Sequence, residues 1–569
     1  MAASTTRVVQ ATIQGQRVTV RRASDVFVQC LEAEGVRRVF GIPGEETLDL
    51  NRSLHESSID FVPVRHEQGG AYMADMTGRL TGRAGVCLGT LGPGALNLVT
   101  AVADAYLDRA PLVALTGQRA LAWMHKESHQ FVDLVEVLRP ITKWNARVWS
   151  PDIIPEVVRK AFKVAEGDKP GATHLELPED VMAQPLEAAP LQRRRAAHPE
   201  PSVREIMRAA EVVCSASDPV VLAGNGVLRG HASQALREFA RATGIPVAET
   251  FMGKGALDYE DPRALGTVGL HDRDYELAGF AEADVVITIG YDLVEHAPEH
   301  WNPRRDKRIV VVDTAPAETD AYYTPEVELV GDLHHVLMRL AEECRDAAAQ
   351  RRTPKISSRL RELVLGSLES ARDDDGFPLR PPRALWELRR ALGPSDMLVS
   401  DVGLHKLWIA RMFPAHEPNT VLIANGLAGM GFALPSAIAA KLVYPERNVV
   451  AVSGDGGFLM NAQELETAAR LGTAVVNVVW EDRAFGSIAW KQEQRFGEHF
   501  GTDFRNPDFV TFAESFGLPA WRCGSADDFR QHLRHALGLD VPSLIVLPID
   551  YSVDVAISDE LGEETVIRT

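Results

Sequence analysis

Short apolar runs rich in Val, Ile and Leu recur along most of the chain, and segments with helical periodicity separate them. The clearest runs are Val36–Ile42, Gly85–Leu88, Leu112–Thr116, Pro219–Ala223, Val285–Ile289, Ile309–Val312, Val449–Val452, Val475–Trp480 and Ser543–Leu547. Runs this short and this apolar are typical of strands in parallel sheets that helices cover on both faces. Their alternation with helices predicts an α/β fold of doubly wound parallel sheets.

The length of the chain sets the number of such sheets. With 569 residues, and at roughly 100–200 residues per domain, we expect about three domains. Two stretches resemble linkers: residues 185–202, which carry Pro, Ala and an Arg run, and the highly charged residues 345–383. We therefore predict domains at residues 23–184, 203–344 and 376–556.

Charge and cysteine content exclude several classes of protein. Lys and Arg total 60 against 79 Asp and Glu, a net charge of −19, so we expect no nucleic-acid partner and no membrane-surface binding. The five cysteines are far apart and form no CxxC pair, which argues against a disulfide framework or a zinc site. The first 22 residues lack the apolar stretch of a signal peptide, and no run of 18 apolar residues occurs. We expect a cytoplasmic protein.

The segment Val449–Gly486 carries the strongest chemical signal. An apolar strand ends at Gly454-Asp455-Gly456-Gly457, a helix follows, and a second strand, Val475–Trp480, leads into Asp482, 27 residues after Asp455. Asn461 and Glu464 have the spacing of a helix N-cap and its capping-box partner. The segment predicts a βαβ unit, in which the carboxyl ends of both strands meet at one edge of the sheet.

Two carboxylates at that edge suit one Mg²⁺ ion, which typically takes one or two protein carboxylates and completes its shell with phosphate oxygens and water. Gly456 and Gly457 would let the backbone approach those phosphates closely. The residues therefore predict a magnesium-diphosphate site. The alternative is structural: Gly454–Gly457 as a tight turn and Asp482 as a solvated strand end.

This segment resembles the diphosphate-binding motif of thiamine diphosphate enzymes, a GDG followed about 27 residues later by Asn. Here Asp482 stands where most of that superfamily has the Asn. The resemblance implies that Asp455 and Asp482 bind Mg²⁺ through their side chains and Ala484 through its carbonyl. It also implies that the cofactor contacts Gly454, Asp455, Gly456, Gly457, Asp482, Ala484, Phe485 and Gly486.

A second half-site follows from the same resemblance. Residues 63–70, PVRHEQGG, resemble the HEQGG/A segment of acetolactate synthases, whose Glu activates the aminopyrimidine ring of the cofactor. That role would fall to Glu67, a general acid–base. The alternative for Glu67 is an ion pair with Arg65 or another base.

Further segments match the acetolactate synthase type in order along the chain. They are residues 40–44 (FGIPG), 90–97 (TLGPGALN), 115–118 (LTGQ), 128–130 (SHQ) and 426–435 (GLAGMGFALP). The resemblance assigns Gly44, Pro93, Asn97, Gly429 and Met430 to cofactor binding, and Gln118 and Gln130 to the orientation of substrate oxygens. Met430 could otherwise be ordinary core packing.

Other features bear on the branch of this family. Decarboxylases of the pyruvate decarboxylase type carry adjacent histidines and a Glu six residues past the metal-binding Asn. This chain has no His-His pair, and the corresponding residue is Ile488. Residues 224–230, GNGVLRG, give a weak dinucleotide signal. Residues 289–302 and Asp482, in contrast, resemble the flavin-free catabolic form, so we expect no tightly bound FAD.

The resemblance implies three domains. The N-terminal domain binds the pyrimidine of the cofactor, the second is a central domain, and the C-terminal domain binds the diphosphate. The implied enzyme uses thiamine diphosphate and Mg²⁺ to decarboxylate pyruvate and to transfer the hydroxyethyl unit to a second 2-oxo acid. Its site would lie between subunits of a homodimer or homotetramer. The alternatives are another 2-oxo acid decarboxylase or acyltransferase, such as a sulfoacetaldehyde acetyltransferase, or an inactive cofactor-binding subunit.

Overall fold

The computed structural model describes residues 9–13, 16–194, 199–270, 272–345 and 359–552. By their internal contacts these residues form two compact units. The first comprises the residues up to 196 with Pro435–Tyr444 and Asn461–Leu471, and the second comprises the rest. Three parallel six-stranded sheets form the framework, which confirms the predicted α/β class.

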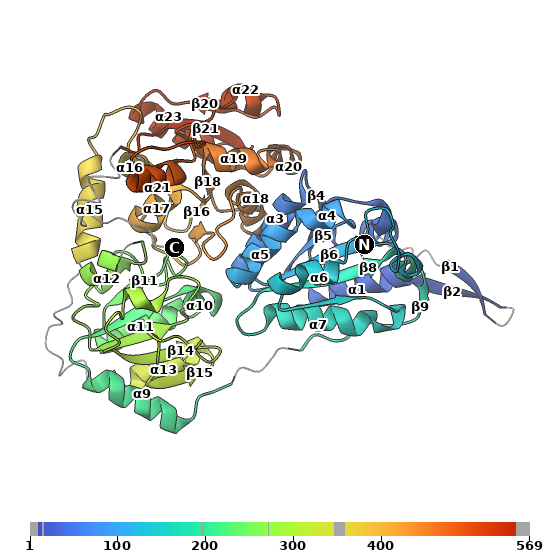
Figure 1. Cartoon of the computed structure of the whole chain (residues 1–569), viewed down its shortest axis with the longest axis horizontal. Coiled ribbons are helices and arrows are strands. Elements are labelled where there is room, and N and C mark those ends of the chain that lie inside the picture. The colour runs from blue at the N-terminus through green and yellow to red at the C-terminus, as the bar shows by residue number, and fades with distance from the viewer. Residues whose placement is uncertain (1–8, 14–15, 195–198, 271, 346–358, 553–569) are drawn as a thin grey trace. The chain divides into compact units, whose positions relative to one another are not determined.

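The first sheet has the order β4-β3-β5-β6-β8-β7. Its strands are β3 (Arg38–Gly41), β4 (Asp60–Pro63), β5 (Gly85–Gly89), β6 (Leu112–Gln118), β7 (Trp144–Arg147) and β8 (Ala172–Pro178). Helices α1 (Ala23–Glu34) and α7 (Ile154–Glu166) cover one face, and α3 (Glu67–Thr81) and α5 (Val99–Leu107) cover the other (Figure 1). The short helices of this domain are α2 (Leu48–His55), α4 (Pro93–Asn97), α6 (Leu134–Leu138) and α8 (Glu179–Met182).

A small antiparallel sheet, which we did not predict, joins the polar N-terminal segment to the end of the first domain. It consists of β1 (Val9–Ile13), β2 (Gln16–Arg22) and β9 (Pro185–Leu186). The backbone pairing of β2 with β9 therefore begins inside the stretch that we interpreted as a linker.

The central sheet has the order β12-β11-β10-β13-β14-β15. Its strands are β10 (Pro219–Ala223), β11 (Val247–Glu249), β12 (Ala264–Thr267), β13 (Val285–Ile289), β14 (Arg308–Asp313) and β15 (Val327–Val330). Helices α9 (Val203–Ser215), α11 (Ser233–Thr243) and α13 (Leu333–Glu343) share one hydrophobic core on one face of the sheet. Two short helices, α10 (Asn225–Arg229) and α12 (Asp272–Leu277), follow the ends of β10 and β12.

The third sheet has the order β17-β16-β18-β19-β21-β20. Its strands are β16 (Met397–Ser400), β17 (Val421–Ile423), β18 (Val449–Gly454), β19 (Val475–Glu481), β20 (Ala520–Arg522) and β21 (Ser543–Pro548). The helices of this part of the chain are α16 (Pro381–Ala391), α17 (Leu404–Met412), α18 (Ala433–Val443), α19 (Asp455–Asn461), α20 (Glu464–Leu471), α21 (Gly486–Phe496), α22 (Phe509–Glu514) and α23 (Ala526–Leu537). By their contacts, most of α18 and all of α20 belong to the first unit.

All nine apolar runs of the sequence are strands of these sheets, and all five cysteines are free thiols. The second linker was wrong in part, because α15 (Arg359–Ala371) lies within residues 345–383. Leu360, Val364 and Leu368 recur every four residues and bury one stripe of this helix, while the charged residues that suggested a linker occupy its other faces. The domain boundaries themselves stay predictions.

Candidate active site

Asp455 and Asp482 end two neighbouring strands. Gly454 of β18 pairs with Trp480 of β19 in a parallel register, so the two acids follow adjacent strand ends, as their spacing predicted. Burial, and then the charge of Asp455 beside it, raises the pKa of Asp482 to about 7. The two carboxyl groups therefore lie close enough to repel each other, with Asp455 buried and Asp482 half-buried.

The chain curls around Asp455 after the second strand. Arg483 adopts a left-handed conformation, with φ of 62°, and its backbone N–H donates to Oδ2 of Asp455 at 2.7 Å. The N–H of Gly456 donates to Oδ1 at 2.9 Å. The N–H of Ala484 donates to Asp482 at 3.3 Å. This turn places Arg483 against Asp455 and Ala484 against Asp482.

Glycines line the same place because side chains would not fit there. A Cβ on Gly456 would lie 2.9 Å from the ring of Phe485, and one on Gly457 would lie 3.2 Å from the carboxyl group of Asp401. A Cβ on Gly486 would lie 2.6 Å from Oδ2 of Asp482. The backbone is thus bare where a bound group could approach it closely.

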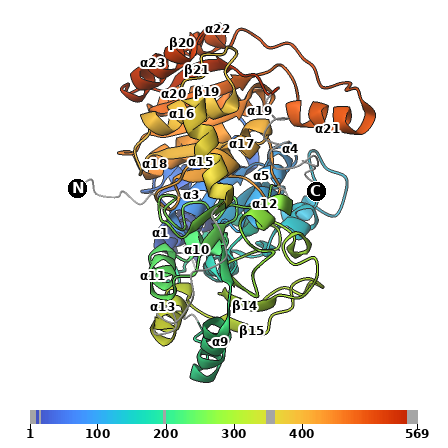
Figure 2. The same ribbon diagram turned by 90° about the vertical axis from the view of Figure 1, so that its left-hand side faces the viewer.

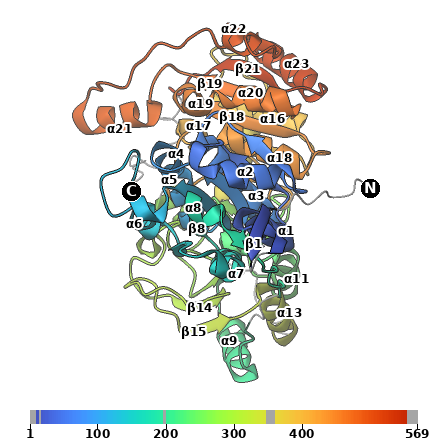
Figure 3. The same cartoon turned by 90° about the vertical axis from the view of Figure 1, so that its right-hand side faces the viewer.

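Helix α21 and its connections follow this turn. None of its residues is buried in the described chain, and Figures 2 and 3 both show it standing away from the third sheet. The N–H of Phe485 donates to the carbonyl of Thr502 at 2.9 Å. This bond joins the residue before α21 to the segment that follows the helix. Ile488 is 48% exposed on this helix.

The predicted capping box at Asn461 and Glu464 was wrong. Asn461 is the last residue of α19 rather than the cap of the next helix, and α20 begins at Glu464. The carboxylate of Glu464 accepts hydrogen bonds from the backbone N–H groups of Arg65 and His66 instead. The local spacing matched the motif, but a partner 399 residues away in the sequence takes the side chain.

Three residues that we did not single out hold this site. Asp401, directly after β16, accepts from the N–H groups of Val402 at 2.7 Å and Gly431 at 2.9 Å, and burial raises its pKa to about 6. Asp401 thereby fixes the loop that contains Gly429 and Met430. The side chain of Met430 is only half-buried. Like Asp455, Asp401 follows a short apolar strand, so the same strand-end rule could have found it.

The other two are His405 and Asn506. The imidazole of His405 lies against Gly403 and Gly454, and burial lowers its pKa to about 3, so the ring is neutral. Its Nε2 has no hydrogen-bond partner among the described residues. The amide of Asn506 donates to Oδ2 of Asp455 at 2.7 Å from a loop with no sequence signal of its own.

Glu67 opens helix α3 after β4 and a short turn. Its side chain is buried, with 6% exposed, and Oε2 accepts from the amide of Asn97 at 2.9 Å. A Cβ on Gly94 would lie 3.0 Å from Oε1. The alternative ion pair with Arg65 is not among the contacts of the described residues, and Asn97 is the partner instead.

The loops around Glu67 meet at glycines. A Cβ on Gly44 would lie 2.3 Å from the hydroxyl of Thr90. Gly92, with φ of 51°, turns the chain into Pro93, the first residue of α4. Residues 41–44 and 90–97 therefore pack closely, and the structure brings together Gly44, Pro93, Asn97 and Glu67.

The two glutamines lie in different settings. Gln118 is fully buried at the end of β6, and its amide donates to Glu176 at 2.8 Å and to the carbonyl of Val132 at 3.0 Å. Gln130 is exposed in a left-handed conformation, with φ of 58°. The amide of Gln118 thus anchors the segment that presents Gln130.

No helix in the described part of the chain is long and apolar enough to cross a bilayer. Within the same residues no group of three or more His, Cys, Asp and Glu side chains forms a metal cluster. Asp455 and Asp482, at adjacent strand ends, together offer two carboxyl groups to a cation, which would need further ligands from a bound group.

Family models match all three parts of the chain. The N-terminal TPP binding domain of thiamine pyrophosphate enzymes matches residues 21–137, the central domain residues 206–340 and the C-terminal TPP binding domain residues 401–547. Thiamine pyrophosphate is another name for thiamine diphosphate. The chain therefore belongs to the thiamine pyrophosphate enzyme family.

Relatives narrow the type of enzyme. The chain is 35% identical over 559 residues to an acetolactate synthase of Bacillus subtilis, which covers 98% of each chain. It is 36% identical over 535 residues to a catabolic acetolactate synthase of Raoultella terrigena, covering 93% of this chain and 95% of the relative. A probable acetolactate synthase large subunit of Methanocaldococcus jannaschii is 35% identical over 559 residues, covering 93% and 92%. The protein is a thiamine diphosphate-dependent enzyme of the acetolactate synthase type.

Proposed function

We propose that the protein joins two molecules of pyruvate to give 2-acetolactate and one CO₂. The observation that carries the proposal is the similarity to an acetolactate synthase over 98% of the chain. This chain carries Glu67, Asp455 and Asp482. A chain that bound the cofactor without turnover would not need the buried acid at position 67.

The residues fit the diphosphate end of the cofactor. Asp455 and Asp482 offer hard oxygen ligands whose mutual repulsion a divalent cation would relieve. We propose that both side chains and the carbonyl of Ala484 hold Mg²⁺, while Gly456 and Gly457 let the diphosphate approach the backbone. Thiamine diphosphate, when bound, supplies the carbon that adds to a 2-oxo group and the electron sink for loss of CO₂.

The chain's own groups then handle protons and orientation. Glu67 shares a proton with a ring nitrogen of the pyrimidine in a buried slot, and Asn97 holds its other oxygen. Gln130 and the N–H groups of residues 41–44 orient substrate oxygens. Gln118 acts through its bond to Val132. The apolar Ile488 cannot donate a proton, which favours bond formation with a second carbonyl over release of an aldehyde.

The active unit is proposed to be a homodimer or homotetramer. In the arrangement that the resemblance implies, Glu67 comes from one subunit and the pair Asp455 and Asp482 from the other. A monomer would then hold only one half of each of two different sites and be inactive.

We also propose that the enzyme works without FAD, because the turn after β10 is already filled. The carboxyl group of Glu295 accepts from the N–H of Asn225, at 3.0 and 3.2 Å, and from that of Asp292 at 3.3 Å. The hydroxyl of Thr250 donates to the same group. A Cβ on Gly224 would lie 2.8 Å from it. Glu295 thus takes the N–H donors and the space that a dinucleotide phosphate would need.

The position of this turn in the sheet strengthens the point. β10 lies between β11 and β13, where the strand order reverses, and open α/β sheets bind ligands at such a switch point. Asp292, which pairs with Arg229 at 2.9 Å, and Asp313 add negative charge around the same place. A pyrophosphate would meet these acids instead of free N–H groups.

We expect the protein to retain no flavin. After incubation with FAD and gel filtration, the denatured supernatant should show no flavin fluorescence, and added FAD should leave turnover unchanged. A flavin-dependent synthase treated in parallel is the control. One FAD per chain in this protein would contradict the proposed filling of the turn by Glu295.

A product assay tests the proposed reaction. Purified protein with thiamine diphosphate, Mg²⁺ and pyruvate, and no flavin, should release one CO₂ per acetolactate, and acid should then yield one acetoin and a second CO₂. Free acetaldehyde would mean decarboxylase chemistry despite Ile488. Turnover only with another donor and acceptor, such as sulfoacetaldehyde as donor and phosphate as acceptor, would indicate an acyltransferase instead. Tight cofactor binding without CO₂ from any 2-oxo acid would support an inactive subunit.

A further inference from the structure

A buried acid on α20 contacts the start of the helix that carries Glu67. Glu464 has no exposed surface, and its Oε1 accepts from the N–H of Arg65 at 3.1 Å and from that of His66 at 3.0 Å. Its Oε2 accepts from the hydroxyl of Thr467 at 2.6 Å. Both oxygens of this carboxyl group are therefore committed.

The geometry leaves little freedom at this contact. A Cβ on Gly69 would lie 2.7 Å from Oε1 of Glu464. Arg470, near the end of α20, donates to the carbonyl of Pro63, the last residue of β4. Two side chains of α20 thus bracket the turn between β4 and α3.

The contact satisfies groups that a helix start leaves open. The first N–H groups of a helix have no partner within it, and a carboxylate near them is favourable. His66 caps α3 from within the chain, since its Nδ1 accepts from the N–H of Gln68 at 3.2 Å. Glu464 adds the bonds to the two residues before Glu67.

We propose that Glu464 is a positioning residue, which fixes the turn at Arg65 and His66 and thereby aims Glu67 at the pyrimidine. The inference rests on the proposed role of Glu67. The slot of Glu67 is narrow, between the amide of Asn97 and the backbone at Gly94. A small displacement of the first turn of α3 would therefore move the carboxylate off its partner.

The placement of α20 in the sequence gives this contact a wider meaning. Helix α20 lies between Asp455 and Asp482 along the chain, so the segment that joins the two proposed metal ligands also holds the turn before Glu67. One short stretch of sequence therefore contributes to both kinds of half-site, which in the proposed dimer belong to two different active sites.

The test compares Glu464→Ala with Glu464→Gln. In the Ala variant we expect kcat for pyruvate to fall about 10- to 100-fold, the cost of a misplaced catalytic group, with little change in KM. Amide exchange at residues 65–69, measured on the full-length protein with and without thiamine diphosphate and Mg²⁺, should become about 5- to 30-fold faster, as for a lost cap. Gln keeps an acceptor oxygen and should restore both readouts.

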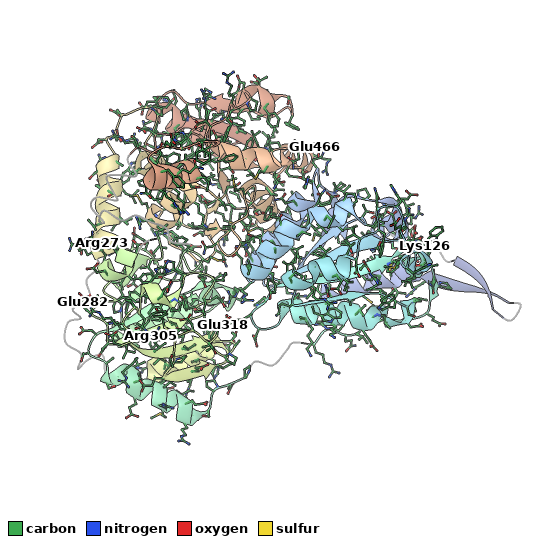
Figure 4. All side chains as sticks on the ribbon, in the orientation of Figure 1. Lys126, Arg273, Glu282, Arg305, Glu318 and Glu466 are labelled. Atoms are coloured by element: carbon green, nitrogen blue, oxygen red, sulfur yellow. The ribbon has the colours of Figure 1, made fainter. Side chains whose placement is uncertain are left out.

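The control is Glu466→Gln on the same helix, which removes a charge there but keeps an oxygen for Arg470, the residue that donates to Pro63. Glu466 lies at the outer side of α20 (Figure 4) and pairs with Arg470 at 3.0 Å, without contacting Arg65 or His66. It should leave exchange at residues 65–69 and kcat nearly unchanged.

Gly69→Ala serves as a second variant if Glu464→Ala fails to fold. The new methyl group would displace the Glu464 carboxylate while favouring the helix itself, so we expect the same loss of kcat in a folded protein. Unchanged exchange at residues 65–69 in both variants would overturn the proposal, as would a Gln variant as impaired as Ala. Normal turnover in Glu67→Gln would instead remove Glu67 from the mechanism, and absence of turnover in the unmodified protein would contradict the proposed function. Neither result would change the reading of amide exchange at residues 65–69.

Discussion

Replacing Glu67 with Gln should lower kcat for pyruvate about 10²- to 10⁴-fold, the usual contribution of a general acid–base. Gln can still accept from the amide of Asn97, which now bonds to Oε2 of Glu67 at 2.9 Å, but it cannot share a proton with the cofactor. The exchange of the C2 proton of bound thiamine diphosphate for deuterium should slow by a similar factor. Binding of the cofactor with Mg²⁺ should change little, because Asp455 and Asp482 are untouched.

Rapid quench in D₂O followed by NMR of the released cofactor measures the exchange. Glu34→Gln is the matched control, since Glu34 is an equally buried acid of the same domain, 3% exposed, that bonds to Arg159. It should exchange at the rate of the unmodified protein. Fast C2 exchange in Glu67→Gln would remove Glu67 from the mechanism.

The sequence predicted those parts of the site that depend on strand ends. Asp455 and Asp482 each follow an apolar strand, and parallel strands that are neighbours must place their ends together. The pairing of Glu67 with Asn97 was not predicted. The resemblance assigned both residues to cofactor binding, but no local pattern joins residues 30 positions apart.

The parts that were missed depend on contacts between distant segments. Glu464 has the spacing of a capping box, yet its partners are at Arg65 and His66, and only the packed chain decides which N–H groups it meets. Asn506 approaches Asp455 from an irregular loop 51 residues further on. A period of 2 or 3.6 residues carries no information about such pairs.

The charge of residues 345–383 misled for a related reason. The stretch as a whole is rich in acids and bases, which is typical of linkers, but within α15 three apolar residues at helical spacing suffice to bury one face. Composition averages over faces, whereas packing depends on a single stripe.

Replacing Asp455 with Ala should have the largest effect on cofactor loading. We expect the apparent affinity for Mg²⁺ to fall by more than the roughly 10- to 100-fold that loss of an outer-shell partner gives. Asp455 is proposed as a metal ligand, and it also anchors the turn through the N–H of Arg483 and the amide of Asn506. Asp482→Asn keeps an oxygen ligand and removes one of two repelling charges, so its loss should be far smaller.

To compare the variants, bound metal is first removed with EDTA. Turnover is then titrated with Mg²⁺ at saturating thiamine diphosphate, which gives the apparent affinity of each variant for Mg²⁺. Asn506→Ala, which removes a single bond to Asp455, should fall between Asp455→Ala and Asp482→Asn. Asp528→Asn is the control, because Asp528 accepts from the N–H of Gly524 at the surface of the same domain and should titrate normally. If Asp455→Ala reloads at the Mg²⁺ concentration of the unmodified protein, the cation is held elsewhere. If Asp482→Asn has a lower apparent affinity for Mg²⁺ than Asp455→Ala, the end of the second strand rather than that of the first anchors the metal.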